Sequence, residues 1–345
     1  MPEYAILIYP AANRVYTDSS SALLSAELEV FARTVLSTEV VSVTERSIGG
    51  VAYITFETSN PLTEAEIAHL SNLSSLYALF EMDGAALRPL GVAQLAMFDS
   101  DLLTIQRYSG RTNELFTKLL LNVTLLSTQD PARLLRDGGH LLDPLCGRGT
   151  TLHQAMMYGF DATGIETDGK DFDAYCQFIK TWLRNKRIKH SAETVAIRKN
   201  KEQLGRRIDI EYGRSKQQHK SGDTRTLAYL NCDTLRAAEL LKPNSTDVIV
   251  TDAPYGVQHG SQRPAANLTR DPRELLTAAL PGWLRTLRPG GAIGISWNTN
   301  VADRAELVRI LSDAGLEVAS TAPFERFAHR VDQAIVRDLA VARKP

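Results

Sequence analysis

The feature that most constrains the fold is a repeated alternation of short apolar runs and amphipathic stretches along residues 141–341. The apolar runs have the length of buried strands, and the stretches between them carry apolar residues at helical spacing. Repeated strand-then-helix units predict a parallel sheet with helices on both faces. We expect its strands at 141–145, 162–165, 227–230, 247–251, 292–297 and 333–341. We expect its helices near 150–158, 171–186, 234–241, 272–287 and 302–313, with a further helix from an Asn113 cap to residue 122.

Residues 1–95 follow a different order, in which strands predominate. Apolar runs at 4–9, 40–43, 51–56, 76–80 and 85–89 predict strands, and helical spacing appears at 20–36 and again after Pro61. The pairs Gly49-Gly50 and Asp83-Gly84 are typical of hairpin turns. This order predicts a small α+β domain at residues 1–95, followed by an α/β domain at residues 96–345. A chain of 345 residues is long enough for both.

Composition excludes several classes of protein. No apolar run approaches the roughly 18 residues that span a membrane, and the N-terminus lacks the basic region of a signal peptide. The cysteines Cys146, Cys176 and Cys232 are far apart, which argues against a disulfide framework or a zinc site. We therefore expect a cytoplasmic protein with no metal centre and no membrane partner.

A glycine-rich turn, Asp143-Pro-Leu-Cys-Gly-Arg-Gly-Thr150, joins the first strand of the predicted parallel sheet to a helix. Ligands of such sheets bind outside the carboxyl ends of the strands. Gly147 and Gly149 let a ligand approach the backbone, and the helix N-terminus offers free N–H groups to a carboxylate. Asp143 can accept from a ligand ammonium group. This combination suits the zwitterionic methionyl end of S-adenosyl-L-methionine.

Two further acids are expected at strand ends on the same edge of the sheet. Glu166 follows the second strand, where an acid commonly holds ribose hydroxyls, and Asp233 follows the third, where it could accept from an adenine amino group. A dinucleotide is the rival ligand, but its fingerprint needs a third glycine where Leu152 stands. A turn without any ligand is the remaining alternative.

The most informative segment for chemistry is Asp252-Ala-Pro-Tyr-Gly256, which follows the apolar run 247–251. The carboxylate of Asp252 and the carbonyl of Ala253 can each accept one N–H of an exocyclic amine, which aims the nitrogen lone pair. Pro254 makes the turn rigid, and Tyr255 can stack on a base taken out of its helix. A plain strand-to-loop turn with a buried aromatic ring is the alternative.

The two motifs together resemble those of the amino-directed nucleic-acid methyltransferases, and most closely the THUMP-associated tRNA guanosine N2-methyltransferases. The resemblance covers roughly residues 105–345. It implies a Rossmann-like class I methyltransferase sheet and S-adenosyl-L-methionine as cofactor. On the motif positions, it implies catalytic roles for Asp252, Ala253, Pro254 and Tyr255. It implies cofactor contacts for Asp143, Pro144, Cys146, Gly147, Gly149, Thr150, Glu166 and Asp233.

The chain departs from this family at two places. Ala253 stands where the family usually has proline, which keeps the carbonyl but loses some rigidity. Residues 1–95 resemble the small ferredoxin-like piece that precedes THUMP in the family, but they are too few for a full THUMP domain as well. Both departures bear on the target nucleotide.

A basic segment gives the best indication of a nucleic-acid partner. Residues 183–220 contain twelve cations and four anions, a net +8 in a chain of net −1. We expect an irregular insertion that contacts tRNA phosphates together with the N-terminal domain, with Trp182 and Tyr212 as nearby aromatics. The predicted contacts are Arg184, Lys186, Arg187, Lys189, Arg198, Lys199, Lys201, Arg206 and Arg207. A solvated loop is the alternative.

Two weaker segments flank the motifs. Residues 108–113 either close over the cofactor or form an ordinary helix-capping loop, and His259 either contacts substrate or is a surface residue. The prediction for the whole chain is an RNA methyltransferase, with N2-methylguanosine in tRNA as the expected product. The alternatives are a DNA adenine or cytosine amino methyltransferase, for which no target-recognition domain is evident, and a non-catalytic binding protein of the same fold. An NAD-linked oxidoreductase is disfavoured by the glycine spacing.

Overall fold

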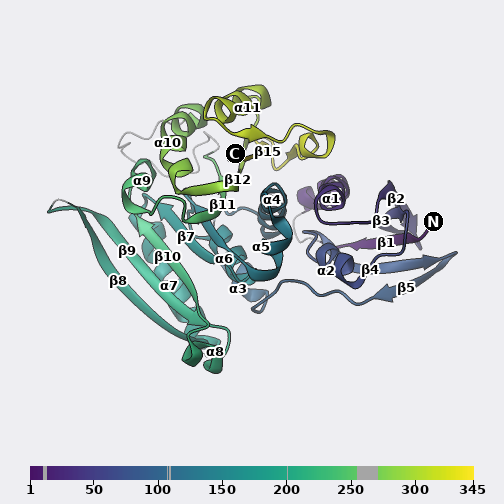
Figure 1. Cartoon of the computed structure of the whole chain (residues 1–345), viewed down its shortest axis with the longest axis horizontal. Helices are drawn as coiled ribbons and strands as arrows, with labels where there is room; N and C mark the ends of the chain where they lie inside the picture. The colour runs from purple at the N-terminus through teal and green to yellow at the C-terminus, as the bar shows by residue number, and fades with distance from the viewer. Residues whose placement is uncertain (11–13, 107, 109, 200, 255–270) are drawn as a thin grey trace.

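The computed structural model describes residues 1–10, 14–106, 108, 110–199, 201–254 and 271–345, and it contains two sheets (Figure 1). The smaller sheet belongs to the N-terminal part of the chain and the larger one to the rest. Across the part of the chain that the structure describes, no helix has both the length and the hydropathy to cross a membrane.

The N-terminal sheet is antiparallel throughout, in the order β2-β3-β1-β4-β5. Its elements are β1 (Glu3–Ile8), α1 (Arg14–Thr34), β2 (Val40–Ile48), β3 (Val51–Thr58), α2 (Glu64–Leu70), β4 (Leu76–Asp83) and β5 (Ala86–Leu90). The predicted order of strands and helices is confirmed. Thr63 and Glu66 form a capping box at the start of α2, which explains why the helix begins there.

The larger sheet is the predicted Rossmann-like sheet, with the strand order β13-β15-β12-β11-β6-β7-β10-β9-β8. Its parallel centre consists of β6 (His140–Asp143), β7 (Asp161–Glu166), β10 (Arg225–Asn231), β11 (Thr246–Asp252) and β12 (Leu287–Asn298). Beside β12 runs the antiparallel β15 (Val336–Arg343), which also pairs with the short strands β13 (Glu317–Val318) and β14 (His329–Arg330). The central residues of these strands are mostly buried, as expected where helices cover both faces of a parallel sheet.

The helices of this part follow the predicted alternation. They are α3 (Asp101–Thr104), α4 (Glu114–Leu126), α5 (Pro131–Asp137), α6 (Thr150–Met157), α7 (Gly169–Asn185), α8 (Lys216–Ser221), α9 (Ala237–Leu240), α10 (Pro272–Thr286) and α11 (Arg304–Asp313), with 3-10 turns η1 (Thr234–Arg236) and η2 (Ala322–Glu325). The side chain of Asn113 caps α4 by accepting from the backbone N–H groups of Leu115 and Phe116, as predicted.

The basic segment is regular, so the predicted irregular insertion is wrong. It forms a long antiparallel hairpin, β8 (Lys189–Lys199) and β9 (Glu202–Gly213), which extends the larger sheet beyond β10 and projects past its edge (Figure 1). The physical reason is visible in β9, where Ile208, Ile210 and Tyr212 alternate with charged residues and are buried.

The two sheets share one core. Helix α1 packs on α4, and a single cluster of buried apolar side chains runs from the N-terminal sheet to the larger one. At this junction Glu27, which is fully buried, accepts from Asn122 Nδ2 at 2.7 Å and from Ser74 Oγ at 2.6 Å. Burial raises the pKa of Glu27. The N-terminal part is therefore packed on the larger part rather than tethered to it.

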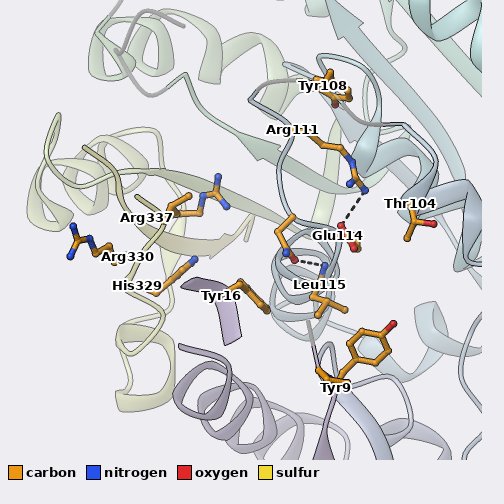
Figure 2. A pocket seen from close by; sticks show the side chains of 13 residues that line it. Tyr9, Tyr16, Thr104, Tyr108, Arg111, Glu114, Leu115, His329, Arg330 and Arg337 are labelled. Atoms are coloured by element: carbon orange, nitrogen blue, oxygen red, sulfur yellow. Dashed lines mark hydrogen bonds and ion pairs between the residues drawn. The ribbon is translucent and has the colours of Figure 1, made fainter. Parts of the chain in front are cut away.

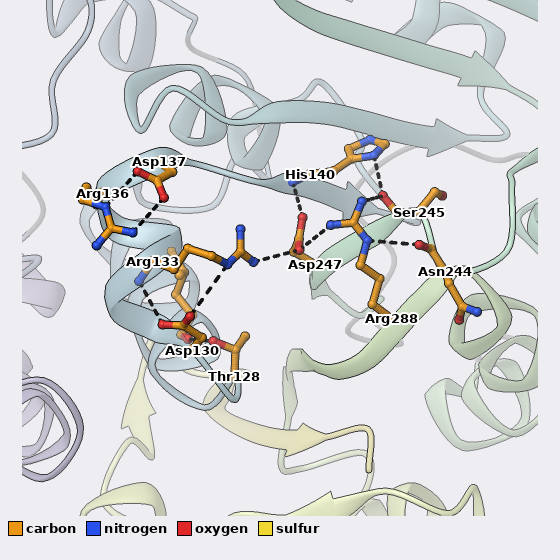
Figure 3. Close-up of polar contacts among 11 residues, drawn as sticks. Thr128, Asp130, Arg133, Arg136, Asp137, His140, Asn244, Ser245, Asp247 and Arg288 are labelled. Atoms are coloured by element: carbon orange, nitrogen blue, oxygen red, sulfur yellow. Dashed lines mark hydrogen bonds and ion pairs between the residues drawn. The ribbon is translucent and has the colours of Figure 1, made fainter.

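A polar network fastens the amino-terminal edge of the larger sheet (Figure 3). The buried carboxylate of Asp247, near the start of β11, accepts from Arg288 Nη1 at 2.7 Å, from Arg133 Nη2 at 3.3 Å and from the His140 backbone N–H at 2.8 Å. These contacts tie β6, α5 and β12 to β11. They lie at the opposite strand ends from the predicted site.

Candidate functional site

The glycine-rich turn has a backbone that only glycine accommodates well. Gly147 and Gly149 have φ values of 49° and 80°, in the left-handed region. Gly149 caps α6, and a Cβ there would lie 2.3 Å from the Tyr175 ring. A Cβ on Gly147 would meet nothing within 4 Å, so this residue leaves open space above the turn.

Asp143, the last residue of β6, is buried behind this turn. Its carboxylate accepts from the Leu145 backbone N–H at 3.1 Å and from Thr251 Oγ1 at 2.8 Å. Burial raises the pKa of Asp143 to about 7, and the nearby negative charge of Asp252 acts in the same direction. A buried acid with a raised pKa is ready to take a cationic group as its counter-ion.

Glu166, the last residue of β7, stabilises the glycine-rich turn through hydrogen bonds. Its carboxylate accepts from the backbone N–H groups of Gly147 at 3.1 Å and Asp168 at 2.9 Å, and burial raises its pKa. The backbone N–H of Cys146 donates to Ile165 O at 3.0 Å, which fastens the turn to β7 as well. Within the described residues Glu166 thus positions the turn, and its contact with ribose stays a prediction.

Asp252, the last residue of β11, is held from the segment before α4, from β12 and from β15. It accepts from Thr112 Oγ1 at 2.7 Å, from the Ser296 hydroxyl on β12, and from Arg337 Nη2 on β15 at 3.5 Å. The backbone N–H of Ala253 donates to Ser296 O at 2.8 Å. Ser296 and Arg337 were not among the predicted site residues. Arg337 gave a signal in the sequence, because it is a charged residue in a strand predicted to be apolar.

A cavity of about 420 Å³ brings the two motifs together. It opens at the carboxyl ends of β6 and β11. From the predicted set, it is lined by Asp143, Cys146, Gly147, Thr150, Asp252, Ala253 and Pro254. Tyr108, Gly110 and Thr112 line it too, so the segment that precedes α4 closes one side of this cavity. The Arg148 guanidinium stacks over the Tyr108 ring, with its Cζ atom 4.8 Å from the ring centroid.

Other predicted residues lie elsewhere. Pro144, Gly149 and Glu166 support the turn without lining the cavity, and Asp233 caps η1 by accepting from the Leu235 backbone N–H at 2.9 Å. Tyr255 and His259 lie outside the described residues, so their predicted roles stay predictions.

The aromatic residues of the basic segment do not face a ligand. Trp182 and Tyr212 are only 4% and 1% exposed, and the Trp182 indole N–H donates to Asp101 Oδ1 at 3.0 Å. Trp182 and Tyr212 lie near the cations, as predicted, but α7 and β9 turn both rings inward against Phe98, so they do not offer a stacking surface. Part of the charge is also matched by acids. Lys186, Lys199, Arg206 and Arg207 form ion pairs with carboxylates.

A comparison with known protein families agrees with the methyltransferase chemistry that the glycine-rich turn and the cavity suggest. Residues 133–290 match the family model described as RMKL-like, methyltransferase domain. This part of the chain is therefore a methyltransferase domain, and S-adenosyl-L-methionine is its methyl donor. This match does not test the narrower resemblance to THUMP-associated tRNA enzymes. No curated protein matches the chain.

Several solved structures match parts of this chain at low sequence identity. A TehB-like SAM-dependent methyltransferase from Corynebacterium glutamicum has 16% identity and a TM-score of 0.35, over 60% of this chain and 81% of its own. TYW2 of P. horikoshii, in complex with MeSAdo, has 12% identity and a TM-score of 0.34, over 84% and 74%. A T. thermophilus 16S rRNA N2 methyltransferase with AdoMet and guanosine has 14% identity and a TM-score of 0.30, over 63% and 40%.

Proposed function

We propose that this protein methylates an exocyclic base amine of RNA, with guanosine N2 in tRNA as the target. The observation that carries the proposal is that Asp252 and the glycine-rich turn face one cavity. An amine held by Asp252 is thus placed beside a methionyl group held by the turn. The three free cysteines are consistent with a cytoplasmic site of action.

The cavity at the glycine-rich turn has a size and a chemistry that suit the cofactor. The cavity of about 420 Å³ lies within the range of about 300–1,000 Å³ that is common for small-ligand sites. Asp143 would accept from the ammonium group, while the first N–H groups of α6 would receive the carboxylate. The open space above Gly147 would let the ligand lie against the backbone. When bound, S-adenosyl-L-methionine supplies an electrophilic methyl group.

Asp252 and Ala253 would hold the target amine. The lone pair of an aromatic amine is delocalised, so the nitrogen attacks well only when its N–H groups are fixed by acceptors. The Asp252 carboxylate and the Ala253 carbonyl would supply two acceptors. Thr112, Ser296 and Arg337 keep the carboxylate in one orientation, which lowers the cost of ordering it during the reaction.

Replacing Asp252 tests this role. The variant Asp252→Asn keeps the shape but loses the charge and one acceptor, so we expect methyl transfer to fall by about 100-fold or more. Binding of S-adenosyl-L-methionine, measured by calorimetry, should stay within about threefold. The control is Asp313→Asn, an exposed acid on α11, which should behave as wild type. Full methyl transfer in Asp252→Asn would contradict the proposed mechanism.

A further inference from the structure

A second cavity, of about 580 Å³, lies between the N-terminal part and the methyltransferase part of the chain. Its walls come from the two residues after β1, from α1, from Thr104, Tyr108 and the start of α4, and from the β14–β15 region, as Figure 2 shows. Tyr108 lines both this interdomain cavity and the cofactor cavity. Arg337 lines it as well and reaches Asp252 Oδ2 at 3.5 Å. A ligand in the interdomain cavity would therefore lie next to the amine site.

The charge of the interdomain cavity favours an anion. Its described lining has three arginines, of which Arg111 pairs with Glu114 at 3.2 Å and Arg337 pairs with Asp252 at 3.5 Å, while Arg330 adds a further positive charge. Burial lowers the pKa of His329 to about 4, so this ring is neutral near pH 7. Arg330 is exposed on the rim, and its Nε donates to the Asp332 carbonyl at 3.0 Å. Guanidinium groups in this setting suit phosphate oxygens.

The aromatic lining favours a base. Tyr9 is 43% exposed and meets Tyr77, which is 56% exposed, edge to face with ring centroids 5.7 Å apart. An exposed aromatic ring in a cavity that also contains arginines supplies the parts of a stacking surface for unpaired bases. Tyr16, by contrast, is buried against His329 and closes the floor. Of the three tyrosines in the described lining, Tyr9 is the most exposed, so its ring can receive a base without rearranging the core.

We propose that the interdomain cavity binds the single-stranded RNA nucleotides that flank the reacting nucleotide. This inference rests on the proposed function and names how that site receives its substrate. Arg330 would contact a phosphate and Tyr9 would stack on a base. A cavity of this volume admits individual nucleotides but is too small to enclose a duplex. The target must therefore be unpaired or extruded when it reaches Asp252.

The test is equilibrium binding of a fluorescein-labelled single-stranded RNA 10-mer, followed by anisotropy at several salt concentrations. Tyr9→Ala and Arg330→Gln should each weaken binding by about tenfold. Arg330→Gln should also reduce the slope of log K against log salt by about 1. The control is Arg88→Gln, whose side chain on β5 is 70% exposed, and it should bind within about twofold of wild type. Affinity for S-adenosyl-L-methionine should be unchanged in all three variants.

The competing outcomes are separable. Wild-type affinity in both cavity variants, or no binding of the 10-mer by the wild-type protein, would overturn the proposal. Tighter binding of a matched duplex or of single-stranded DNA would overturn the assignment to unpaired RNA. Labelled methyl transfer to RNA with unchanged KM in both variants would overturn the cavity's role while the proposed function stands. Lost 10-mer binding in both variants, with no methyl transfer to any nucleic acid, would support the cavity and contradict the proposed function.

Discussion

The turn that joins β6 to α6 allows a sharp comparison of two neighbouring glycines. Gly149→Ala places a methyl group 2.3 Å from the Tyr175 ring, which is fully buried and stacked on Tyr229 with centroids 4.7 Å apart. Moving that ring in a packed core costs about 1–3 kcal/mol. The left-handed backbone adds about 1 kcal/mol for any residue with a Cβ. We expect the free energy of unfolding to fall by about 2–4 kcal/mol.

Gly147→Ala is the matched control because it shares the left-handed backbone but meets open space. Its loss of stability should be about 1 kcal/mol. Its methyl group, however, enters the cofactor cavity, so the affinity for S-adenosyl-L-methionine should fall more than the stability does. Gly149→Ala should show the larger loss of stability, and Gly147→Ala the more specific loss of cofactor binding.

Thermal unfolding followed by tryptophan fluorescence measures the stability difference, since all three tryptophans lie in the larger part of the chain. For a unit of this size, about 3 kcal/mol corresponds to a Tm decrease of about 6–12 °C. Calorimetry with S-adenosyl-L-methionine measures the second quantity. Equal Tm values for the two variants, or a lower Tm for Gly147→Ala, would refute the packing argument.

Three further predictions concern other parts of the molecule. Because the pKa of Asp143 is raised to about 7, its carboxyl is mostly protonated in mildly acid solution. The contribution of this group to the unfolding free energy is therefore fully present below about pH 4 and is lost as the pH rises through about 7. Binding of a cationic ammonium should therefore release a proton near pH 6.5, seen by calorimetry in buffers of different ionisation enthalpy, and Asp143→Asn should abolish that release. Asp247→Ala leaves Arg288 and Arg133 without their shared carboxylate. It should lower the unfolding free energy, measured by urea titration, by about 2–3 kcal/mol, a value discounted because both arginines are half exposed. The control Asp137→Ala breaks an exposed pair and should leave the unfolding free energy nearly unchanged. The double variant Arg198→Gln, Lys201→Gln removes exposed charges of the hairpin, so it should weaken tRNA binding and reduce the slope of log K against log salt by about 2. The control Arg343→Gln, toward the other edge of the sheet, should change neither quantity. An unchanged slope in the double variant would exclude the hairpin as a phosphate contact.

The local features of this fold were predictable from short stretches of sequence. Asn113 caps α4 because its side chain acts within three residues, and the strand-to-helix turn after Asp143 follows from the glycines and the apolar run before it. The meeting of Asp143 and Asp252 also followed, since parallel strands place their carboxyl ends at one edge. Thr251 Oγ1, adjacent to Asp252, donates directly to Asp143.

The features that were missed depend on pairing between distant segments. Arg337 reaches Asp252 only because β15 returns antiparallel beside β12, and no local pattern specifies that neighbour. The hairpin of β8 and β9 was hidden by its charges, although Ile208, Ile210 and Tyr212 carried the period of a strand. Trp182 was read as a neighbour of cations, yet the amphipathic face of α7 decides its orientation. Charge counts thus describe composition, while periodicity describes which way a side chain points.

The central claim is that the paired motifs transfer a methyl group to an exocyclic base amine of RNA. The most direct measurement incubates the protein with methyl-labelled S-adenosyl-L-methionine and separate pools of tRNA, rRNA and DNA, then digests each pool to nucleosides and identifies the labelled one. The account predicts label in the tRNA pool, on N2 of guanosine, and less label by about 100-fold or more with Asp252→Asn. Label confined to DNA, or on a ring nitrogen, a carbon or a ribose oxygen, would contradict it.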